Sequence, residues 1–306
     1  MRIGYPCINL SIGCKADRKF RLKSYSIQRL INTINNNLRC LKKILEYNTD
    51  HSILFFRITS DLIPFASHPI CKVNWQKKFT HIFEELGTYI KKHEIRISMH
   101  PNQFTLINPI DQKIFRRSLK ELRYHTEVLD LLELDSSAKI QIHVGGIYGD
   151  KSGSMNRFIS RYQKLEETIK QRLVIENDDR GYNLKDCIQI HNVTKIPVLF
   201  DSLHHEIKNS GETLTEAFEL FTKTWRKKDG LPMVDYSAQQ SEQKKGKHAE
   251  TLDTKHFKHF LRSTSPFDYD LMLEIKDKEQ SALKAIKIAK QTKGKQLIPG
   301  TISDQP

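Results

Sequence analysis

Short apolar runs alternate with longer, helix-patterned segments along most of the chain. The short runs are rich in β-branched and aromatic residues, which is typical of strands. Eight runs are predicted strands: Arg2–Leu10, Ser52–Ile58, Ile95–His100, Lys139–His143, Leu173–Ile175, Pro197–Phe200, Met233–Tyr236 and Leu271–Glu274. Between them, apolar residues recur every three or four positions. The predicted helices are Ser24–Tyr47, Trp75–His93, Gln112–Leu132, Asn156–Lys170, Glu212–Thr224 and Lys276–Gln291.

This alternation predicts an α/β protein with strand–helix units around a parallel sheet. Eight strands in 306 residues fit a single-domain TIM (β/α)8-type barrel. An open doubly wound sheet gives the same alternation and stays open as an alternative. We expect the barrel over residues 1–292 and a poorly ordered tail over 293–306. The polar stretch 237–250 is the best candidate for a long functional loop.

The net charge of the chain indicates a class of binding partner. The chain has 50 Lys and Arg against 36 Asp and Glu, a formal net charge of +14. Such a surplus attracts polyanions, and nucleic acid is the leading partner, although a solubility role or codon bias explains the charge equally well. No apolar run approaches the roughly 18 residues that a bilayer span needs, and the start does not resemble a secretion signal. We therefore expect a cytoplasmic protein without membrane contact.

The cysteines do not form a recognisable framework. They contain no CxxC pair and lack the dense, even spacing of a disulfide scaffold. We expect reduced, mostly buried thiols at Cys7, Cys14, Cys40, Cys71 and Cys187.

The chemistry is suggested by the residues at the strand ends. Five predicted strands end in, or are directly followed by, a histidine or a carboxylate: His100, His143, Glu176, Asp201 and Glu274. All strands of a parallel barrel finish on one face, so these side chains would converge there. Leaving them unpaired at the mouth of an apolar core would be unfavourable, and a bound cation resolves this. Further candidate ligands lie nearby in sequence: His68, His204, Asp235 and His248.

Eight or nine nitrogen and oxygen ligands exceed the needs of one ion, which indicates a cluster of two or three. Such ligands suit Mn²⁺ or Zn²⁺, and Mg²⁺ less well. On a basic protein, this cluster points to phosphodiester hydrolysis, because paired ions activate water and stabilise the leaving oxygen. A water oriented by Glu176 or Glu274 would attack phosphorus, and His100 and Asp235 complete the catalytic candidates. The other histidines are expected to be structural: His51, His81, His93, His125, His191, His205, His256 and His259.

Several ordered motifs resemble the UV damage endonuclease family. They are His100-Pro-Asn-Gln-Phe104, His143-Val-Gly-Gly-Ile-Tyr-Gly-Asp150, Leu173-Val-Ile-Glu-Asn-Asp-Asp179 and Phe200-Asp-Ser-Leu-His-His205, with Ile3–Asn9 and Met272–Asp277 also matching. The resemblance spans residues 1 to about 290. It implies a barrel related to endonuclease IV, up to three metals commonly assigned as Mn²⁺, and no nucleotide cofactor. The implied activity is incision immediately 5′ of UV photoproducts in double-stranded DNA, with abasic sites sometimes accepted.

The resemblance also implies residue roles. The ligands would be His68, His100, His143, Glu176, Asp201, His204, His248 and Glu274, with Glu176 bridging two ions. Tyr5 and Gln103 resemble residues that enter the duplex at the lesion, and Asn9 and Phe104 lie beside them. Basic residues that could contact phosphates are Arg57, Lys151, Arg180, Lys244, Lys245 and Lys247, with Lys151 and Lys247 the first choices.

The chain departs from the family pattern near the end of the seventh strand. Many members carry Lys-x-His there, with a carboxylated, metal-binding lysine, whereas this chain has Met233-Val-Asp235. Methionine cannot be carboxylated, so our hypothesis is that Asp235 supplies the missing oxygen directly. The third ion depends on this exchange.

Two other functions are compatible with parts of the pattern. A sugar isomerase of similar barrel type would also use two divalent metals, but its substrate gives no reason for the +14 charge. A non-catalytic basic protein with a structural metal would bind DNA without nicking it. Its crowded carboxylates would repel phosphate, and a structural site needs only four ligands.

Overall fold

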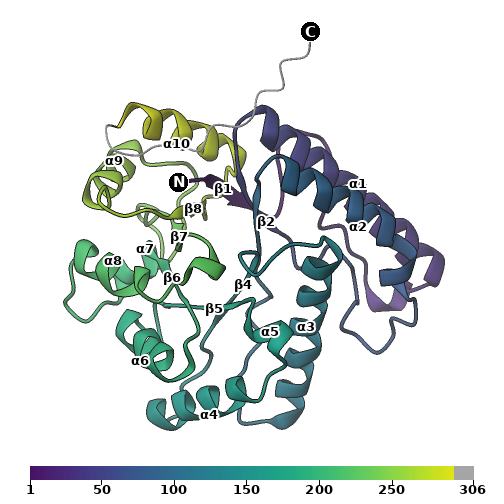
Figure 1. Ribbon diagram of the computed structural model, residues 1–306, viewed down its shortest axis with the longest axis horizontal. Helices are drawn as coiled ribbons and strands as arrows, with labels where there is room; N and C mark the ends of the chain where they lie inside the picture. Colours follow the sequence, from purple (N-terminus) through teal and green to yellow (C-terminus); the bar gives the residue numbers. More distant parts are fainter. Residues whose placement is uncertain (293–306) are drawn as a thin grey trace.

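The predicted strands form a closed parallel barrel. The computed structural model describes residues 1–292, so the tail expected over 293–306 lies outside the described residues. Each strand pairs with the next in sequence, and the last pairs in parallel with the first, Ile3 opposite Leu271. Figure 1 shows the helices arranged around the ring of strands. The (β/α)8 prediction is confirmed, and the open-sheet alternative is wrong.

The strands are short and keep the predicted order. They are β1 (Ile3–Pro6), β2 (Phe55–Ile58), β3 (Arg96–Met99), β4 (Lys139–His143), β5 (Leu173–Glu176), β6 (Val198–Asp201), β7 (Met233–Tyr236) and β8 (Asp270–Leu273). The α-helices are α1 (Ile27–Asp50), α2 (Trp75–Lys92), α3 (Gln112–Leu131), α4 (Lys151–Gln163), α5 (Glu167–Lys170), α6 (Leu184–Thr194), α7 (Ser202–Ile207), α8 (Leu214–Thr222), α9 (Thr254–Ser263) and α10 (Glu279–Gln291). Two 3-10 turns are η1 (Leu22–Ser24) and η2 (Lys227–Asp229).

Three short helices, α6, α7 and α9, were not predicted. Each begins at a polar cap that the apolar pattern does not reveal. Asn183 caps α6 by accepting from the backbone N–H of Asp186, whose side chain accepts in return from the backbone N–H of Asn183. Asp253 caps α9, accepting from two backbone N–H groups. The predicted helix over 156–170 is divided into α4 and α5.

The barrel interior consists of an apolar layer beneath a charged layer. The apolar layer is Phe55, Val174, Leu199, Met233 and Met272. Successive side chains of a strand point to opposite faces, so the residue two positions later points inward again. Those residues are Arg57, Glu176, Asp201, Asp235 and Glu274. Each of these strands therefore places a charged group directly above an apolar one, toward the carboxyl ends of the strands.

The outer face of the barrel carries the main core. Apolar residues of the helices pack there against outward-facing strand residues, as Leu30, Leu38 and Leu41 of α1 do. The opposite helix faces are polar, as the predicted periodicity requires. Among residues 1–292, no helix combines the length and apolar character that crossing a membrane demands.

A disulfide joins Cys14 to Cys40, so the expectation of reduced thiols is wrong for this pair. Cys14 lies in the loop after β1, and Cys40 lies on α1 at a Cα distance of 5.9 Å. They are 26 residues apart in sequence and meet only because the loop folds back along α1. Cys7, Cys71 and Cys187 remain free thiols.

Reducing this disulfide should destabilise the fold. Closing a loop of this length lowers the entropy of the unfolded chain, which stabilises the folded state by about 3 to 4 kcal/mol. We expect Cys14→Ser, or wild type in reductant, to lose that much unfolding free energy in urea denaturation. Cys71→Ser, which replaces a half-buried free thiol, is the matched control. Equal stability with and without reductant would contradict the prediction.

Candidate metal centre

Three overlapping groups of potential ligands lie at the carboxyl ends of the strands. The first is His100, His143 and Glu176; the second is Glu176, Asp201 and His204; the third is Asp201, Asp235 and Glu274. Within each group, one ligand atom per residue lies within 4.8 Å of the others. Glu176 and Asp201 each belong to two groups. This sharing is what a cluster with bridging carboxylates requires.

The ends of β5 and β6 are locked together by an asparagine. Asn177 donates from Nδ2 to the carbonyl oxygen of Asp201 at 3.0 Å, and its Oδ1 accepts from the Asp201 backbone N–H at 2.9 Å. Asp201 then caps α7, because its Oδ1 accepts from the backbone N–H of His204 at 2.7 Å. The cap places the His204 ring 3.2 Å from Glu176 Oε1 through Nδ1. A short helix thus carries one candidate ligand beside two others.

His143 ends β4 and is followed by a tight loop to α4. Gly145 in this loop has φ of +116°, and a Cβ there would lie 2.1 Å from Oδ1 of Asn108. Only glycine permits this close approach. The Nε2 of His143 lies 3.8 Å from Glu176 Oε2, and that of His100 lies 3.7 Å from the same oxygen.

The long polar loop after β7 places His248 beside Glu274, at the same mouth of the barrel. An antiparallel bridge pairs Gln239 with His248 within this loop. The Nδ1 of His248 donates to the carbonyl oxygen of Glu274 at 2.8 Å, which leaves Nε2 facing Glu274 Oε2 at 3.8 Å. Metal-binding histidines usually hold a carbonyl or carboxylate in this way with their second nitrogen.

The polar atoms of the cluster fit a bound cation. Asp201 Oδ2 is buried and has no hydrogen-bond partner among residues 1–292. Burial raises the pKa of Asp201 to about 6, which shows how poorly its negative charge is compensated by the protein alone. Burial also lowers the pKa of His100 to about 4, so its imidazole is neutral near pH 7, the form that binds metal.

Arg57 does not face DNA, so its predicted contact with phosphate is wrong. It is 2% exposed and lies inside the barrel on β2. Its Nη2 donates to both oxygens of Asp235, at 2.7 and 2.8 Å, and its Nη1 contacts Glu274. Burial raises the pKa of Glu274, but the guanidinium more than offsets this and brings the pKa to about 2.

Tyr5 and Asn9 are buried, at 0% and 3% exposure, and offer no surface to a duplex. Tyr5 points away from the barrel interior, and its hydroxyl donates to Asn48 Oδ1 of α1 at 2.7 Å. Asn9 donates from Nδ2 to the Tyr5 hydroxyl at 2.8 Å, and its Oδ1 accepts from two backbone N–H groups. In this structure the two residues hold the β1–α1 loop, and the expectation that they contact DNA is not supported.

Gln103 and Phe104 lie at the exposed tip of the loop after β3. Phe104 is 75% exposed, more than the other large apolar residues of 1–292. A cavity of about 510 Å³ opens beside this loop and reaches the candidate metal ligands His143 and His204. Its lining includes Gln103, His143, Gly146, Asp178, Arg180 and His204.

The remaining predicted residues are more scattered. His68 is exposed and belongs to none of the three ligand groups found among residues 1–292. Lys151 pairs with Asp186 across α4 and α6, and Lys247 donates to Gln243 at 2.9 Å within the polar loop. Arg180, Lys244 and Lys245 are exposed. The histidines expected to be structural lie outside the three groups.

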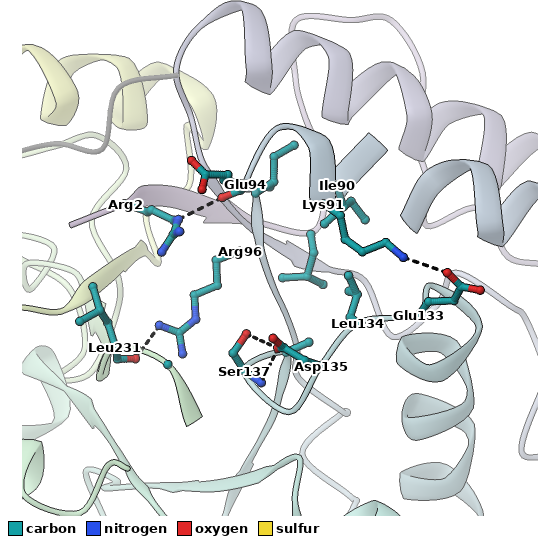
Figure 2. Close-up of a pocket in the computed structure, with 14 residues that line it drawn as sticks. Arg2, Ile90, Lys91, Glu94, Arg96, Glu133, Leu134, Asp135, Ser137 and Leu231 are labelled. Carbon is teal, nitrogen blue, oxygen red and sulfur yellow. Dashed lines mark hydrogen bonds and ion pairs between the residues drawn. The ribbon is translucent and has the colours of Figure 1, made fainter. Parts of the chain in front are cut away.

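A second cavity, of about 340 Å³, lies at the opposite end of the barrel. Figure 2 shows Arg2 and Arg96 on one side of it and Lys91 with Glu133 on the other. Its cations are already paired: Arg2 and Arg96 with Asp270, and Lys91 with Glu133. Paired charges at the amino ends of the strands lie away from the face where barrel enzymes place their sites, so we assign them to the stability of the barrel.

Two residues of the centre were missed in the sequence. Gln141 donates from Nε2 to Asp235 Oδ2 at 2.6 Å and also to Glu176, and Asn177 joins β5 to β6 as described. For Gln141 a signal existed. Lys139, Gln141 and His143 are alternate residues of one strand and must share a face. Because His143 points into the barrel, Gln141 must point into the barrel as well.

Comparison with known proteins relates the chain to DNA repair enzymes. A family model described as UV-endonuclease UvdE matches residues 1–303. A UV DNA damage endonuclease of Clostridium perfringens is 40% identical over 293 residues, covering 95% of this chain and 71% of that protein. The solved structure of SacUVDE superposes with a TM-score of 0.92 at 47% identity, over 96% of this chain and all of the other. Endonuclease IV from Thermus thermophilus, at 12% identity and a TM-score of 0.58 over 95% and 98% of the two chains, shares the fold.

Proposed function

Because the chain belongs to the UV-endonuclease UvdE family, we propose that it cuts double-stranded DNA immediately 5′ of UV photoproducts with a cluster of divalent metal ions. Membership makes the chain an endonuclease of UV-damage repair. It therefore favours this function over a sugar isomerase or a non-catalytic DNA-binding protein. The proposal includes cyclobutane dimers and 6-4 photoproducts as substrates, abasic sites as an additional one, and action as a monomer in the cytoplasm.

The observation that carries the metal dependence is the sharing of Glu176 between two ligand groups. His100, His143 and Glu176 would hold one ion, and Glu176, Asp201 and His204 a second, with His248 and Glu274 beside it. Mn²⁺ suits this mixture of imidazole and carboxylate. Bound divalent ions supply an activated water and neutralise charge on the phosphate.

The chain's own contribution is to hold these groups in place before DNA arrives. Asn177 holds the backbone N–H and carbonyl of Asp201, and the carbonyl of Glu274 holds the ring of His248. Glu176 and Glu274 are proposed to orient water at the mouth, directly above the apolar layer of the barrel. Such prepositioning avoids reorganisation during the reaction.

A duplex with one defined cyclobutane dimer tests the proposal directly. The protein is stripped with chelator, assayed, and assayed again after Mn²⁺, Mg²⁺ or Zn²⁺ is restored. We expect no incision without metal and strong recovery with Mn²⁺, with the product ending immediately 5′ of the dimer on a sequencing ladder. The undamaged duplex is the control, and a duplex with an abasic site tests the wider range. Incision in chelator at the restored rate would contradict the metal dependence.

Gln103 and Phe104 are the residues proposed to probe the duplex, since Tyr5 and Asn9 are buried. Photodimers pair and stack poorly, so they are easier to extrude than normal bases. An exposed ring such as that of Phe104 can stack in the gap while the lesion enters the adjacent cavity. Lys247 and Arg180 are proposed to meet flanking phosphates.

Phe104→Ala should weaken recognition without disturbing the metal centre. Stacking of a base on an aromatic ring contributes about 1–3 kcal/mol, so we expect affinity for the photodimer duplex to fall by about fivefold to 150-fold. The Mn²⁺ content should not change. Ile110→Ala, which removes another exposed apolar side chain (64%) before α3, is the matched control. Equal affinities for the two variants would exclude Phe104 as a probe.

A further inference from the structure

The third ligand group differs from the other two because it already contains a cation. Asp235 is fully buried, and Arg57 Nη2 lies 2.7 and 2.8 Å from its two oxygens. Gln141 donates to the second of these oxygens at 2.6 Å. Both oxygens of Asp235 are therefore occupied by N–H donors, whereas Oδ2 of Asp201 has no partner among residues 1–292.

The two carboxylate oxygens of Glu274 have different neighbours. Its Oε1 is in contact with Nη1 of Arg57, and its Oε2 faces Nε2 of His248 at 3.8 Å. One oxygen thus serves the guanidinium and the other remains available at the mouth. Arg57 itself has 3% side-chain exposure, so it cannot turn outward to release these carboxylates.

We infer that Arg57 is a built-in cation which takes the place of a third metal ion, so that the chain holds two divalent ions and Asp235 binds Arg57 rather than metal. This inference rests on the proposed metal-dependent function. It replaces the hypothesis that Asp235 supplies a metal-binding oxygen. Asp235 and Gln141 then act as positioning residues: they hold Arg57 and, through Gln141 Nε2, the bridging Glu176.

The charges of the centre agree with two ions. Glu176, Asp201, Asp235 and Glu274 bring four negative charges, of which Arg57 balances one. Two divalent ions then leave the centre with a single positive charge, suited to an incoming phosphate. A third ion would add two further positive charges beside a buried guanidinium, where repulsion is poorly screened.

The number of available ligand atoms also agrees with two ions. Met233 belongs to the apolar layer and offers no oxygen. His68 lies outside the three groups. The group around Asp235 is left with Asp201, which the second ion already uses, and with one oxygen of Glu274.

Metal counting on the intact protein tests the inference. The chain is saturated with Mn²⁺, desalted, and analysed by inductively coupled plasma mass spectrometry, with isothermal titration calorimetry as a second readout. We expect two ions per chain in wild type and in Asp235→Asn, because the amide still leaves Arg57 paired with Glu274. In Arg57→Met we expect three, because Asp235 and Glu274 are freed. Arg96→Met removes an equally buried arginine at the other end of the barrel and should keep two.

Circular dichroism confirms that each counted variant is folded. Three ions in wild type, or one ion fewer in Asp235→Asn, would overturn the inference. A folded Arg57→Met that still binds two would also overturn it. The Asp235→Asn result decides the question even where Arg57→Met does not fold. Failure of the proposed function is distinct, since it would be seen as a wild type that binds no metal or that binds two ions and leaves photodimer DNA intact.

Discussion

Glu176→Gln should reduce incision at a photodimer by about 10³-fold or more while leaving binding of the same duplex nearly unchanged. Glu176 is 1% exposed and lies within 4 Å of three candidate histidine ligands. An amide keeps the shape of the side chain but loses the negative charge that two ions would share. Loss of several kcal/mol of transition-state stabilisation corresponds to a fall of this size.

The measurement separates chemistry from recognition. Single-turnover incision reports the first, and fluorescence anisotropy with the photodimer duplex reports the second. Glu121→Gln is the matched control, because Glu121 also faces a buried histidine, His125 at 3.7 Å, but on α3 and away from the mouth. Incision by Glu176→Gln within tenfold of wild type would remove Glu176 from the centre.

Asp270→Asn should lower the free energy of unfolding by about 3–5 kcal/mol, the largest stability effect that we expect. Asp270 is fully buried at the amino end of the barrel and accepts from Arg96 Nη1 at 2.8 Å. It also accepts from the backbone N–H of Arg2 at 2.7 Å. Removing its charge leaves the guanidinium of Arg96 buried without a carboxylate, which is strongly unfavourable.

Urea denaturation measures this loss. Asp130→Asn is the control, since its partner Arg172 is buried but Asp130 itself is 47% exposed, where an ion pair contributes about 1 kcal/mol or less. Incision per folded molecule should not change, because Asp270 lies at the opposite end of the strands from the ligands. If the free energy of unfolding of Asp270→Asn lay within 1 kcal/mol of the wild-type value, other groups would have to compensate the buried charge of Arg96, and the prediction would be wrong.

The architecture and much of the centre could be predicted because both depend on strand periodicity. A strand that ends in His143 or Glu176 after apolar residues brings that group to the mouth of any parallel barrel. Neither the number of residues between the strands nor the details of the loops matters for this. The candidate ligands at five strand ends were therefore found without knowing which strands are neighbours.

The misjudged residues are those whose position depends on which way a strand side chain points, or on how a loop folds back against a helix. Arg57 in Phe-Phe-Arg-Ile and Tyr5 in Ile-Gly-Tyr-Pro lie on short strands that are buried on both faces. Their sequences carry no apolar–polar alternation to show which side points inward. As a result the charged residue turned out to be internal and the aromatic one packed beneath a helix. The Cys14–Cys40 pair depends on the path of an irregular loop, which no periodicity describes.

The short connection between His100 and Phe104 has a mechanical consequence. Only three residues separate a candidate ligand from the exposed ring at the loop tip, and the first of them, Pro101, is buried and restricted in its backbone angles. If Phe104 meets a distorted duplex as proposed, a displacement of the tip would reach the imidazole of His100 through three intervening residues. Recognition and the candidate metal centre would then be linked through a few covalent bonds, without movement of a whole domain.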